Sequence, residues 1–298
     1  MADKNILHML SPLKHVSPFD LNMALDAGYD AVIPYTSVQA GEVAALIQDA
    51  IFSRPPKLGA RTGFFFGGKD AFLALDMLEI AKKAMVPPFM ISLFADPAGS
   101  FTTAAAMVTC VERTLRGKLG RGLEGLAVAV FGATGVVGFS SAVIAARQGA
   151  KVTLVGYDGV ERVRKAASEA ARRFEVALEF ADGSSPDKIG AILAGIEAAL
   201  CAGRAGMHIL GKAELEAAKG LIVAADVNAV PPTGIEGLKM DANGETIGDT
   251  KVLGIGPLTI GQLKSRTESG LFRRMIEAEK PVVFDFRHAS DLARELAG

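Results

Sequence analysis

The chain has 298 residues, of which 50% are hydrophobic and 22% charged, and its formal net charge at pH 7 is −1. Such a chain can bury a sizeable core in one large domain or two ordinary ones. The near-zero charge argues against a nucleic-acid-binding protein, because those proteins typically carry a basic excess.

The predicted elements of the first third alternate between short apolar runs and helical patterns. Strands are expected at residues 5–10, 30–36, 61–68 and 87–96, and helices at 17–28, 43–52 and 71–85. The first helix has clear boundaries, because Ser17 can cap it, Pro18 suits its first turn and Gly28 can end it. A loop with Pro97 and Gly99 then leads into a helix that Ser100, Thr102 or Thr103 can cap.

A stretch rich in glycine and charge, "GKLGRGLEG", predicts a domain boundary between residues 100 and 125. Beyond it, strands are expected at 126–132, 151–156, 175–181, 198–203, 221–226, 251–257 and 281–287, and helices at 136–149, 160–174, 258–278 and the C-terminus. Alternating strands and helices are typical of an α/β fold with parallel sheets. We predict two domains: a smaller α/β domain over residues 1–115, completed by 280–298, and a doubly wound Rossmann-type domain over 116–279.

The N-terminal "MADKNILHML" lacks the long apolar core of a signal peptide, and no stretch reaches the ~18–20 apolar residues of a membrane span. A cytoplasmic protein without a membrane or nucleic-acid partner is expected. Cys110 and Cys201 lie far apart in apolar surroundings and are expected to be reduced, buried thiols. The four histidines lack the spacing of metal ligands, so no metal site is predicted.

The segment "VAVFGATGVVG" carries the strongest functional motif of the chain. Its glycines are spaced G-x-x-G-x-x-G between a predicted strand and a predicted helix, a variant of the loop that holds a dinucleotide pyrophosphate at a helix N-terminus. The candidate cofactor contacts are Gly132, Thr134, Gly135, Val136, Val137 and Gly138. Gly135 is expected to need a positive φ or a close approach of phosphate. The alternative is a tight strand-to-helix turn without a ligand.

Asp158 follows Gly138 by about twenty residues, where an acidic residue that binds the ribose hydroxyls is expected. Its carboxylate favours NAD, since it would repel a 2′-phosphate. Arg162, Arg164 and Lys165 follow closely, however, and any of them is able to accept that phosphate. NAD and NADP therefore both remain plausible, as does a purely structural role of Asp158 as a helix cap.

No candidate base for an alcohol substrate is apparent, and no Ser/His/Asp or Cys/His arrangement is found. The segments "SPFD", "DPAGSFTTAAA", "FGATGVVG", "ADVNAVPPTGI" and "GIGPLTIGQLK" occur in an order that resembles the bacterial methylene-tetrahydromethanopterin dehydrogenases. The likeness runs over nearly the whole chain and is stronger to the branch that accepts both NAD and NADP. It implies hydride transfer from a tetrahydromethanopterin carrier in one-carbon metabolism (formaldehyde oxidation), by a homo-oligomer whose pterin site lies between domains, near a neighbouring subunit.

The resemblance also implies roles for individual residues on the pterin side. Phe19 matches a phenylalanine that packs on the pterin, and Thr103 a threonine near the reacting rings; core packing and helix capping are the alternatives. A lysine and a histidine of the NADP-specific relatives are missing after "GIG", where Lys264 is the nearest basic residue. Lys264, or Lys14 and His15 in the loop before Phe19, are the candidate substitutes, with solvated side chains as the alternative for that pair.

On the cofactor side, Asn228 is a candidate for nicotinamide contacts or a turn residue, and Gly203 for a close backbone approach to the cofactor. Two other functions stay open: a methylene-tetrahydrofolate dehydrogenase and a non-catalytic NAD(P)-binding protein. Hydride loss from a methylene carbon between two nitrogens needs no base, because the nitrogens stabilise the cation that forms. The lack of a candidate base therefore agrees with the family's chemistry.

Overall fold

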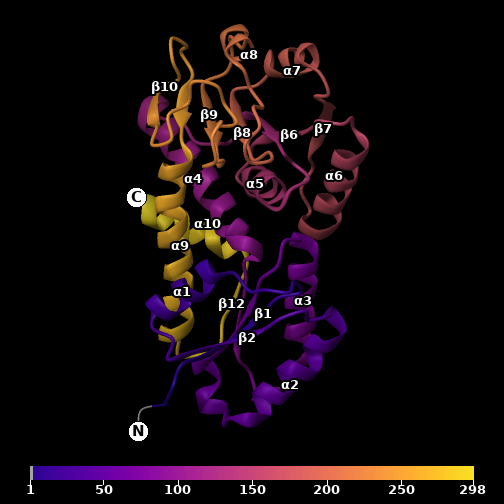
Figure 1. Ribbon diagram of the computed structural model, residues 1–298, viewed down its shortest axis with the longest axis vertical. Helices are drawn as coiled ribbons and strands as arrows, with labels where there is room; N and C mark the ends of the chain where they lie inside the picture. Colours follow the sequence, from indigo (N-terminus) through magenta and orange to yellow (C-terminus); the bar gives the residue numbers. More distant parts are fainter. Residues whose placement is uncertain (1–2) are drawn as a thin grey trace. The chain divides into compact units, whose positions relative to one another are not determined.

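The computed structural model describes residues 3–298, and the chain divides into two compact units. The first contains the residues up to Thr102 together with Ser265–Leu292, and the second contains Thr103–Lys264 and Ala293–Gly298. Each unit is built around one β-sheet with helices against it (Figure 1). Three long helices contain residues of both units: α4 (Ser100–Leu119), α9 (Pro257–Glu277) and α10 (Phe286–Ala297).

The first unit holds a five-stranded parallel sheet in the order β12-β4-β3-β1-β2. Its strands are β1 (Ile6–Leu10), β2 (Ala31–Tyr35), β3 (Thr62–Phe66), β4 (Ser92–Ala95) and β12 (Val283–Phe284); its own helices are α1 (Pro18–Ala27), α2 (Val43–Ser53) and α3 (Ala71–Ala84). The late strand β12 pairs with β4, with Phe284 opposite Phe94. The last strand of the chain therefore completes the sheet of the first unit.

Helix α1 begins and ends where its sequence predicts. The Ser17 hydroxyl accepts a hydrogen bond from the backbone N–H of Asp20 at 3.3 Å, and Pro18 opens the helix. Gly28 ends it in the left-handed region with φ +113°, which favours glycine because the residue lacks a Cβ. These local signals place the start of α1 directly after the loop that follows β1.

The core of the first unit consists of side chains that alternate between the two faces of the sheet. On one face Phe65 and Phe94 pack against Phe272 of α9, with ring centroids 5.5 and 5.3 Å apart. The opposite face is covered by α2 and α3 (Figure 1). Burial on both faces explains why β3 is apolar at nearly every position.

The second unit holds a seven-stranded sheet in the order β10-β11-β9-β8-β5-β6-β7. Its strands are β5 (Ala127–Phe131), β6 (Lys151–Gly156), β7 (Glu179–Asp182), β8 (Ala198–Cys201), β9 (Val223–Asp226), β10 (Asn243–Thr246) and β11 (Leu253–Ile255); its own helices are α5 (Val136–Arg147), α6 (Glu161–Phe174), α7 (Pro186–Leu193) and α8 (Lys212–Ala217). From β5 the chain first builds outward to β7 and then crosses back to β8 on the other side. This reversal of strand order confirms the predicted doubly wound fold.

Strand β10 was not expected from the sequence. It is the one antiparallel member of the seven-stranded sheet and pairs with β11 at its edge. Its residues "NGET" are mostly exposed and include a glycine at φ +93°. A short polar edge strand carries no apolar alternation, so periodicity does not reveal it.

Both cysteines are buried free thiols, as predicted, and burial raises the pKa of each thiol. Over the described part of the chain, none of the helices combines the length and the apolar character that a membrane crossing requires.

Candidate functional site

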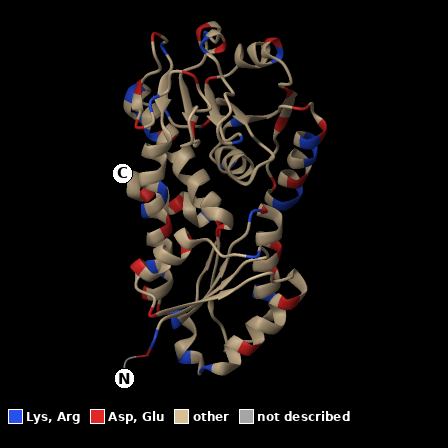
Figure 2. Ribbon diagram, in the orientation of Figure 1, with Lys and Arg blue, Asp and Glu red and all other residues tan. Residues whose placement is uncertain are grey.

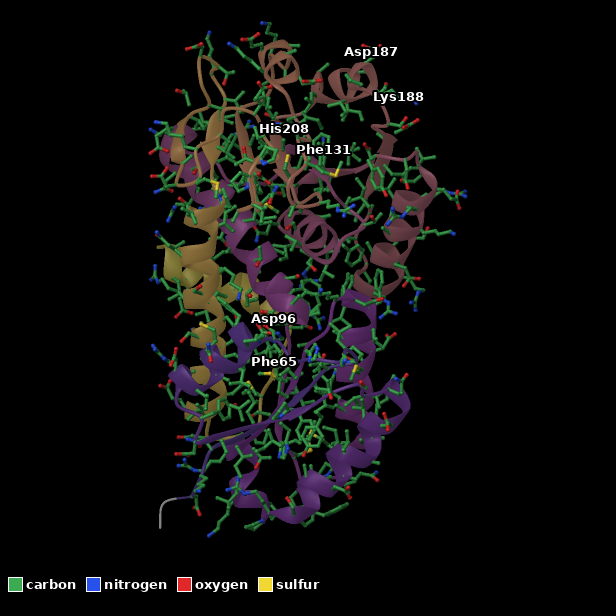
Figure 3. The ribbon with its side chains drawn as sticks, viewed as in Figure 1. Phe65, Asp96, Phe131, Asp187, Lys188 and His208 are labelled. Carbon is green, nitrogen blue, oxygen red and sulfur yellow. The ribbon has the colours of Figure 1, made fainter. Side chains whose placement is uncertain are left out.

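The glycine loop lies at the carboxyl end of β5, where the strand order reverses between β5 and β8. Phe131, labelled in Figure 3, is the last residue of β5, and Gly132 follows it in the left-handed region with φ +71°. A Cβ built on Gly132 would lie 2.2 Å from the carbonyl oxygen of Ala202 and 2.6 Å from the nitrogen of Gly203. Glycine is therefore required here for two reasons, its φ and the adjacent backbone after β8.

The other two glycines of the loop have different roles. A Cβ on Gly138, in the first turn of α5, would lie 2.4 Å from the carbonyl oxygen of Gly132, so this glycine lets the helix pack directly on the loop. Gly135 precedes α5 with φ −79°, and a Cβ there would meet only the Gly132 oxygen, at 3.3 Å. The expectation of a positive φ at Gly135 is therefore wrong, and close approach of a ligand remains as the reason for glycine.

The start of α5 has the properties of an anion site. Thr134 and Gly135 are exposed, and Val136 and Val137 are half-buried where the helix begins. The N–H groups of a helix's first turn and the positive end of its dipole favour negative groups. The exposed, Cβ-free surface at Gly135 fits the approach of a pyrophosphate, so the residues present fit a dinucleotide at this end of the sheet.

Asp158 lies two residues beyond β6, the strand next to β5. It is partly exposed, and its carboxylate accepts a hydrogen bond from Arg162 at 3.3 Å. Arg162 also donates to the hydroxyl of Tyr157 at 3.0 Å. The acidic residue and one of the three candidate cations are therefore in contact at the edge of the sheet that carries the glycine loop.

The structure places Gly203 beside the loop but uses Asn228 locally. Gly203 follows β8, and its backbone nitrogen lies against Gly132. The side-chain amide of Asn228 donates to the carbonyl of Pro232 at 3.2 Å and accepts from the N–H of Val230 at 3.0 Å. Asn228 therefore orders the turn after β9, the alternative that the sequence had left open.

Two buried aspartates were missed from the sequence. Asp226 ends β9 and accepts from the N–H groups of Asn228 and Gly234 at 3.0 and 2.6 Å; burial raises the pKa of this carboxyl. Asp96, labelled in Figure 3, follows β4 and accepts from the N–H of Phe101 at 2.7 Å and from the Thr102 hydroxyl at 2.6 Å.

Asp96 therefore holds the start of α4, because its carboxylate accepts from the backbone N–H groups of Phe101 and Thr102 and from the Thr102 hydroxyl. Asp96 and Asp226 share a local pattern, since each completes the dipeptide Ala-Asp as a buried strand ends. A carboxylate at that point can order the following loop by accepting its backbone N–H groups.

A cavity of about 440 Å³ lies in the first unit, at the carboxyl ends of β1, β3 and β4. The loop after β1 supplies Lys14 and His15, both exposed, and the loop after β3 supplies Lys69. Asp20, in the first turn of α1, lines the cavity although it is 2% exposed. The cavity therefore combines exposed basic side chains at its rim with a buried carboxylate, a set able to bind a polar heterocycle by hydrogen bonds.

The remaining predicted residues lie elsewhere. Phe19 neighbours Asp20 on α1 and is 47% exposed, but it is not among the described residues that line the cavity. Thr103 is half-buried in the first turn of α4, beside the structural Thr102, and Lys264 is buried in α9. The structure thus groups Lys14 and His15 in one unit and the glycine loop, Gly203 and Asp158 in the other.

The described residues offer no cluster of ligands for a metal ion. Within residues 3–298 no group of three or more His, Cys, Asp or Glu side chains is arranged to hold a metal ion. His8, on β1, stacks on Phe64 with ring centroids 4.8 Å apart, and burial lowers the pKa of its imidazole. It packs as a core side chain.

Comparison with known proteins shows full-length relatives. Residues 18–98 match the family model "Methylene-tetrahydromethanopterin dehydrogenase, N-terminal". The NAD(P)-dependent methylenetetrahydromethanopterin dehydrogenase of Methylorubrum extorquens is 50% identical over 295 residues, 99% of each chain. A second protein of that organism, the bifunctional protein MdtA, is 31% identical over 94% of this chain and 95% of its own.

Among solved structures, shikimate 5-dehydrogenase from Listeria monocytogenes, solved with shikimate and NAD, matches with a TM-score of 0.53 and 14% identity. The match covers 99% of this chain and 96% of that one, and it supports the two-sheet α/β fold alone.

Proposed function

Because the chain belongs to the methylene-tetrahydromethanopterin dehydrogenase family, we propose that it oxidises methylene-tetrahydromethanopterin to the methenyl form and transfers the hydride to NAD(P)+. The observation that carries this proposal is the 50% identity to a dehydrogenase of that name over 99% of both chains. The glycine loop at the β5–β8 crossover supports it independently, since this observation rests on geometry rather than on similarity.

In this proposal the second unit is the NAD(P)-binding domain and holds the dinucleotide. The bound cofactor supplies a nicotinamide ring that accepts the hydride. The first turn of α5 binds the pyrophosphate through backbone N–H groups, with Thr134, Gly135, Val136 and Val137 lining the contact. Gly132 and Gly138 shape the loop, Gly203 keeps the neighbouring backbone close, and Asp158 binds the ribose.

In this proposal the first unit is the pterin domain, and its cavity beside β1 receives the polar ring. Lys14 and His15 donate to the ring carbonyl, while the buried Asp20 accepts from ring N–H groups. Phe19, exposed on α1 but outside the cavity lining, contacts a part of the carrier that extends beyond the cavity. Thr103 and Lys264 orient the carrier near the reacting carbon. Asn228 acts on the nicotinamide indirectly, because the turn that its side chain orders contacts the ring.

The chemistry needs no proton transfer by the protein. The reacting methylene carbon lies between two nitrogens, and after hydride loss both nitrogens share the positive charge by resonance. The protein's task is to position the two rings and to exclude water.

We further propose that the protein acts in the cytoplasm as a homo-oligomer with the pterin site near a subunit interface, in the one-carbon oxidation of formaldehyde. Size-exclusion chromatography with light scattering tests the oligomer. A monomer of the expected 31.1 kDa at micromolar concentration would contradict it.

A spectrophotometric assay tests the function. Purified protein is mixed with methylene-tetrahydromethanopterin and either NAD+ or NADP+, and formation of NAD(P)H and of the methenyl product is followed together. Parallel reactions with methylene-tetrahydrofolate separate the two carriers. Nucleotide binding without turnover of either carrier would instead indicate a non-catalytic NAD(P)-binding protein and would overturn the proposal.

A further inference from the structure

An exposed ion pair lies just beyond the carboxyl end of β6, and the proposed function gives a role to its acidic member alone. Asp158 Oδ2 lies 3.3 Å from Arg162 Nη1, and the two side chains are 41% and 52% exposed. Asp158 occupies the position where doubly wound domains bind the adenosine ribose. The cation held at this carboxylate is therefore adjacent to the place where NAD and NADP differ.

Arg162 is also supported by an aromatic ring. Its guanidinium carbon lies 5.6 Å from the centroid of Tyr157, and Nη1 donates to the Tyr157 hydroxyl at 3.0 Å. The hydrogen bonds that Arg162 donates to Asp158 and Tyr157 raise the pKa of its guanidinium, which stays charged in any case. Because Tyr157 is 70% exposed, the guanidinium can rotate over the ring without disturbing the core.

The neighbouring cations have other partners. Arg164 donates to Glu161 at 2.6 Å, and Lys165 lies 3.9 Å from the same carboxylate. Farther along α6, Arg172 and Arg173 pair with Glu169. Figure 2 shows these basic and acidic residues interspersed along the helix. Of the basic residues in this turn, Arg162 is thus the one that pairs with Asp158.

We propose that Arg162 determines the use of both cofactors by changing partner, an inference that rests on the proposed function for the presence of NAD(P) beside the glycine loop. With NAD, the ribose hydroxyls donate to Asp158, and Arg162 stays paired with the carboxylate. With NADP, Arg162 leaves Asp158 and binds the 2′-phosphate, which carries a charge of about −1.5 to −2.

The exchange of partners requires little free energy. An exposed single-contact ion pair contributes little stability, so breaking it opposes binding only weakly. The phosphate offers a stronger, charge-assisted contact to the planar guanidinium. Asp158 alone would repel the phosphate, and Arg162 offsets that repulsion. The pair therefore tolerates either cofactor where an isolated aspartate would select NAD.

Isothermal titration calorimetry with NAD+ and NADP+ tests the inference without any turnover. Arg162→Gln is expected to weaken NADP+ binding by about 10- to 100-fold and to change NAD+ binding by less than about 3-fold. The matched control is Arg164→Gln, which removes a cation of the same helical turn and should leave both affinities within about 2-fold. Asp158→Asn should weaken NAD+ binding and leave NADP+ binding equal or tighter.

Equal loss of both nucleotides in Arg162→Gln, or a larger loss of NADP+ in Arg164→Gln, would overturn the inference. Should Arg162→Gln fail to fold, the salt dependence of the native protein decides: NADP+ affinity must fall more steeply with KCl than NAD+ affinity. A native protein that binds neither nucleotide would refute the proposed function instead, which keeps the two failures distinguishable.

Discussion

Gly132 faces the carbonyl oxygen of Ala202 so closely that a Cβ on Gly132 would lie 2.2 Å from that oxygen. The two residues follow adjacent parallel strands, β5 and β8, whose carboxyl ends meet where the strand order reverses. The contact brings the start of the glycine loop and the backbone of the loop after β8 together at one end of the sheet. It also makes the fold and the proposed cofactor site depend on the same glycine.

Replacement of Gly132 by alanine should therefore affect stability and binding together. The left-handed φ of +71° and the overlap with Ala202 predict a loss of at least about 2 kcal/mol in the free energy of unfolding. Urea unfolding and NAD+ titration measure the two effects. The control is Gly190→Ala in α7, where a Cβ has no atom within 4 Å and should be neutral or stabilising. Equal stability of the two variants would contradict the role of Gly132.

Gly135→Val should separate binding from stability. The backbone at Gly135 has an ordinary φ of −79°, so the fold should tolerate a side chain. The valine would cover the start of α5 and weaken NAD+ binding by at least about 10-fold, since phosphate could no longer approach the backbone N–H groups. Calorimetry and a thermal melt measure the two properties. Gly135→Ala should have a smaller effect, and unchanged affinity in Gly135→Val would remove this loop from the cofactor site.

Lys14→Ala tests the cavity of the first unit. Loss of one charge-assisted hydrogen bond to the pterin should raise the KM for the carrier by about 10-fold and leave the dissociation constant of NAD+ unchanged. Lys57→Ala, at an exposed position of the same unit, is the matched control. A KM that is the same in both variants would place the pterin ring outside this cavity.

Asp285, buried at the start of α10, predicts a contribution to stability that depends on pH. Burial alone would raise its pKa, but hydrogen bonds from His288 and Arg287 outweigh burial and hold the pKa of the carboxyl well below its usual range. A carboxyl with a lowered pKa in the folded state stabilises fully above its unfolded pKa of about 3.9. That stabilisation is lost as the pH falls through the folded-state pKa.

Asp285→Asn should therefore lower the free energy of unfolding by about 1–3 kcal/mol at pH 7. The difference from the native protein should shrink as the pH falls below about 4, because the native carboxyl becomes protonated. Urea unfolding at a series of pH values measures it. Asp291→Asn, exposed on the same helix, should show neither effect. A difference that stays constant down to pH 2 would contradict the assigned charge.

Glu175 offers a stabilising substitution. It ends α6 with φ +57°, a left-handed conformation unfavourable for a residue with a Cβ, and its charge lies at the negative end of the helix dipole. Glu175→Gly should raise the free energy of unfolding by about 0.5–1 kcal/mol. Glu175→Ala removes the charge but keeps the strained backbone, so it should gain less. A larger gain in the alanine variant would show that charge, rather than φ, limits stability here.

Local sequence was sufficient for most of the architecture. The boundaries of α1 follow from Ser17, Pro18 and Gly28, whose effects act within one or two turns of the chain. Apolar strand runs between helical patterns likewise predicted the α/β class, which the two sheets confirm. The ordered motifs indicated the family that the relatives show. Strand β10 was not predicted, because a short polar edge strand has no periodic apolar pattern.

What the sequence by itself determined was therefore the set of elements, the glycine loop and the kind of chemistry that the chain carries. Only the tertiary structure decided which residues meet: Gly132 with Ala202, β12 with β4, Asp96 with the start of α4, and Arg162 rather than Arg164 with Asp158. The physical reason is range. Helix caps and turns depend on neighbours a few residues away, whereas steric contacts and side-chain hydrogen bonds depend on the path of the whole chain, which no short stretch of sequence specifies.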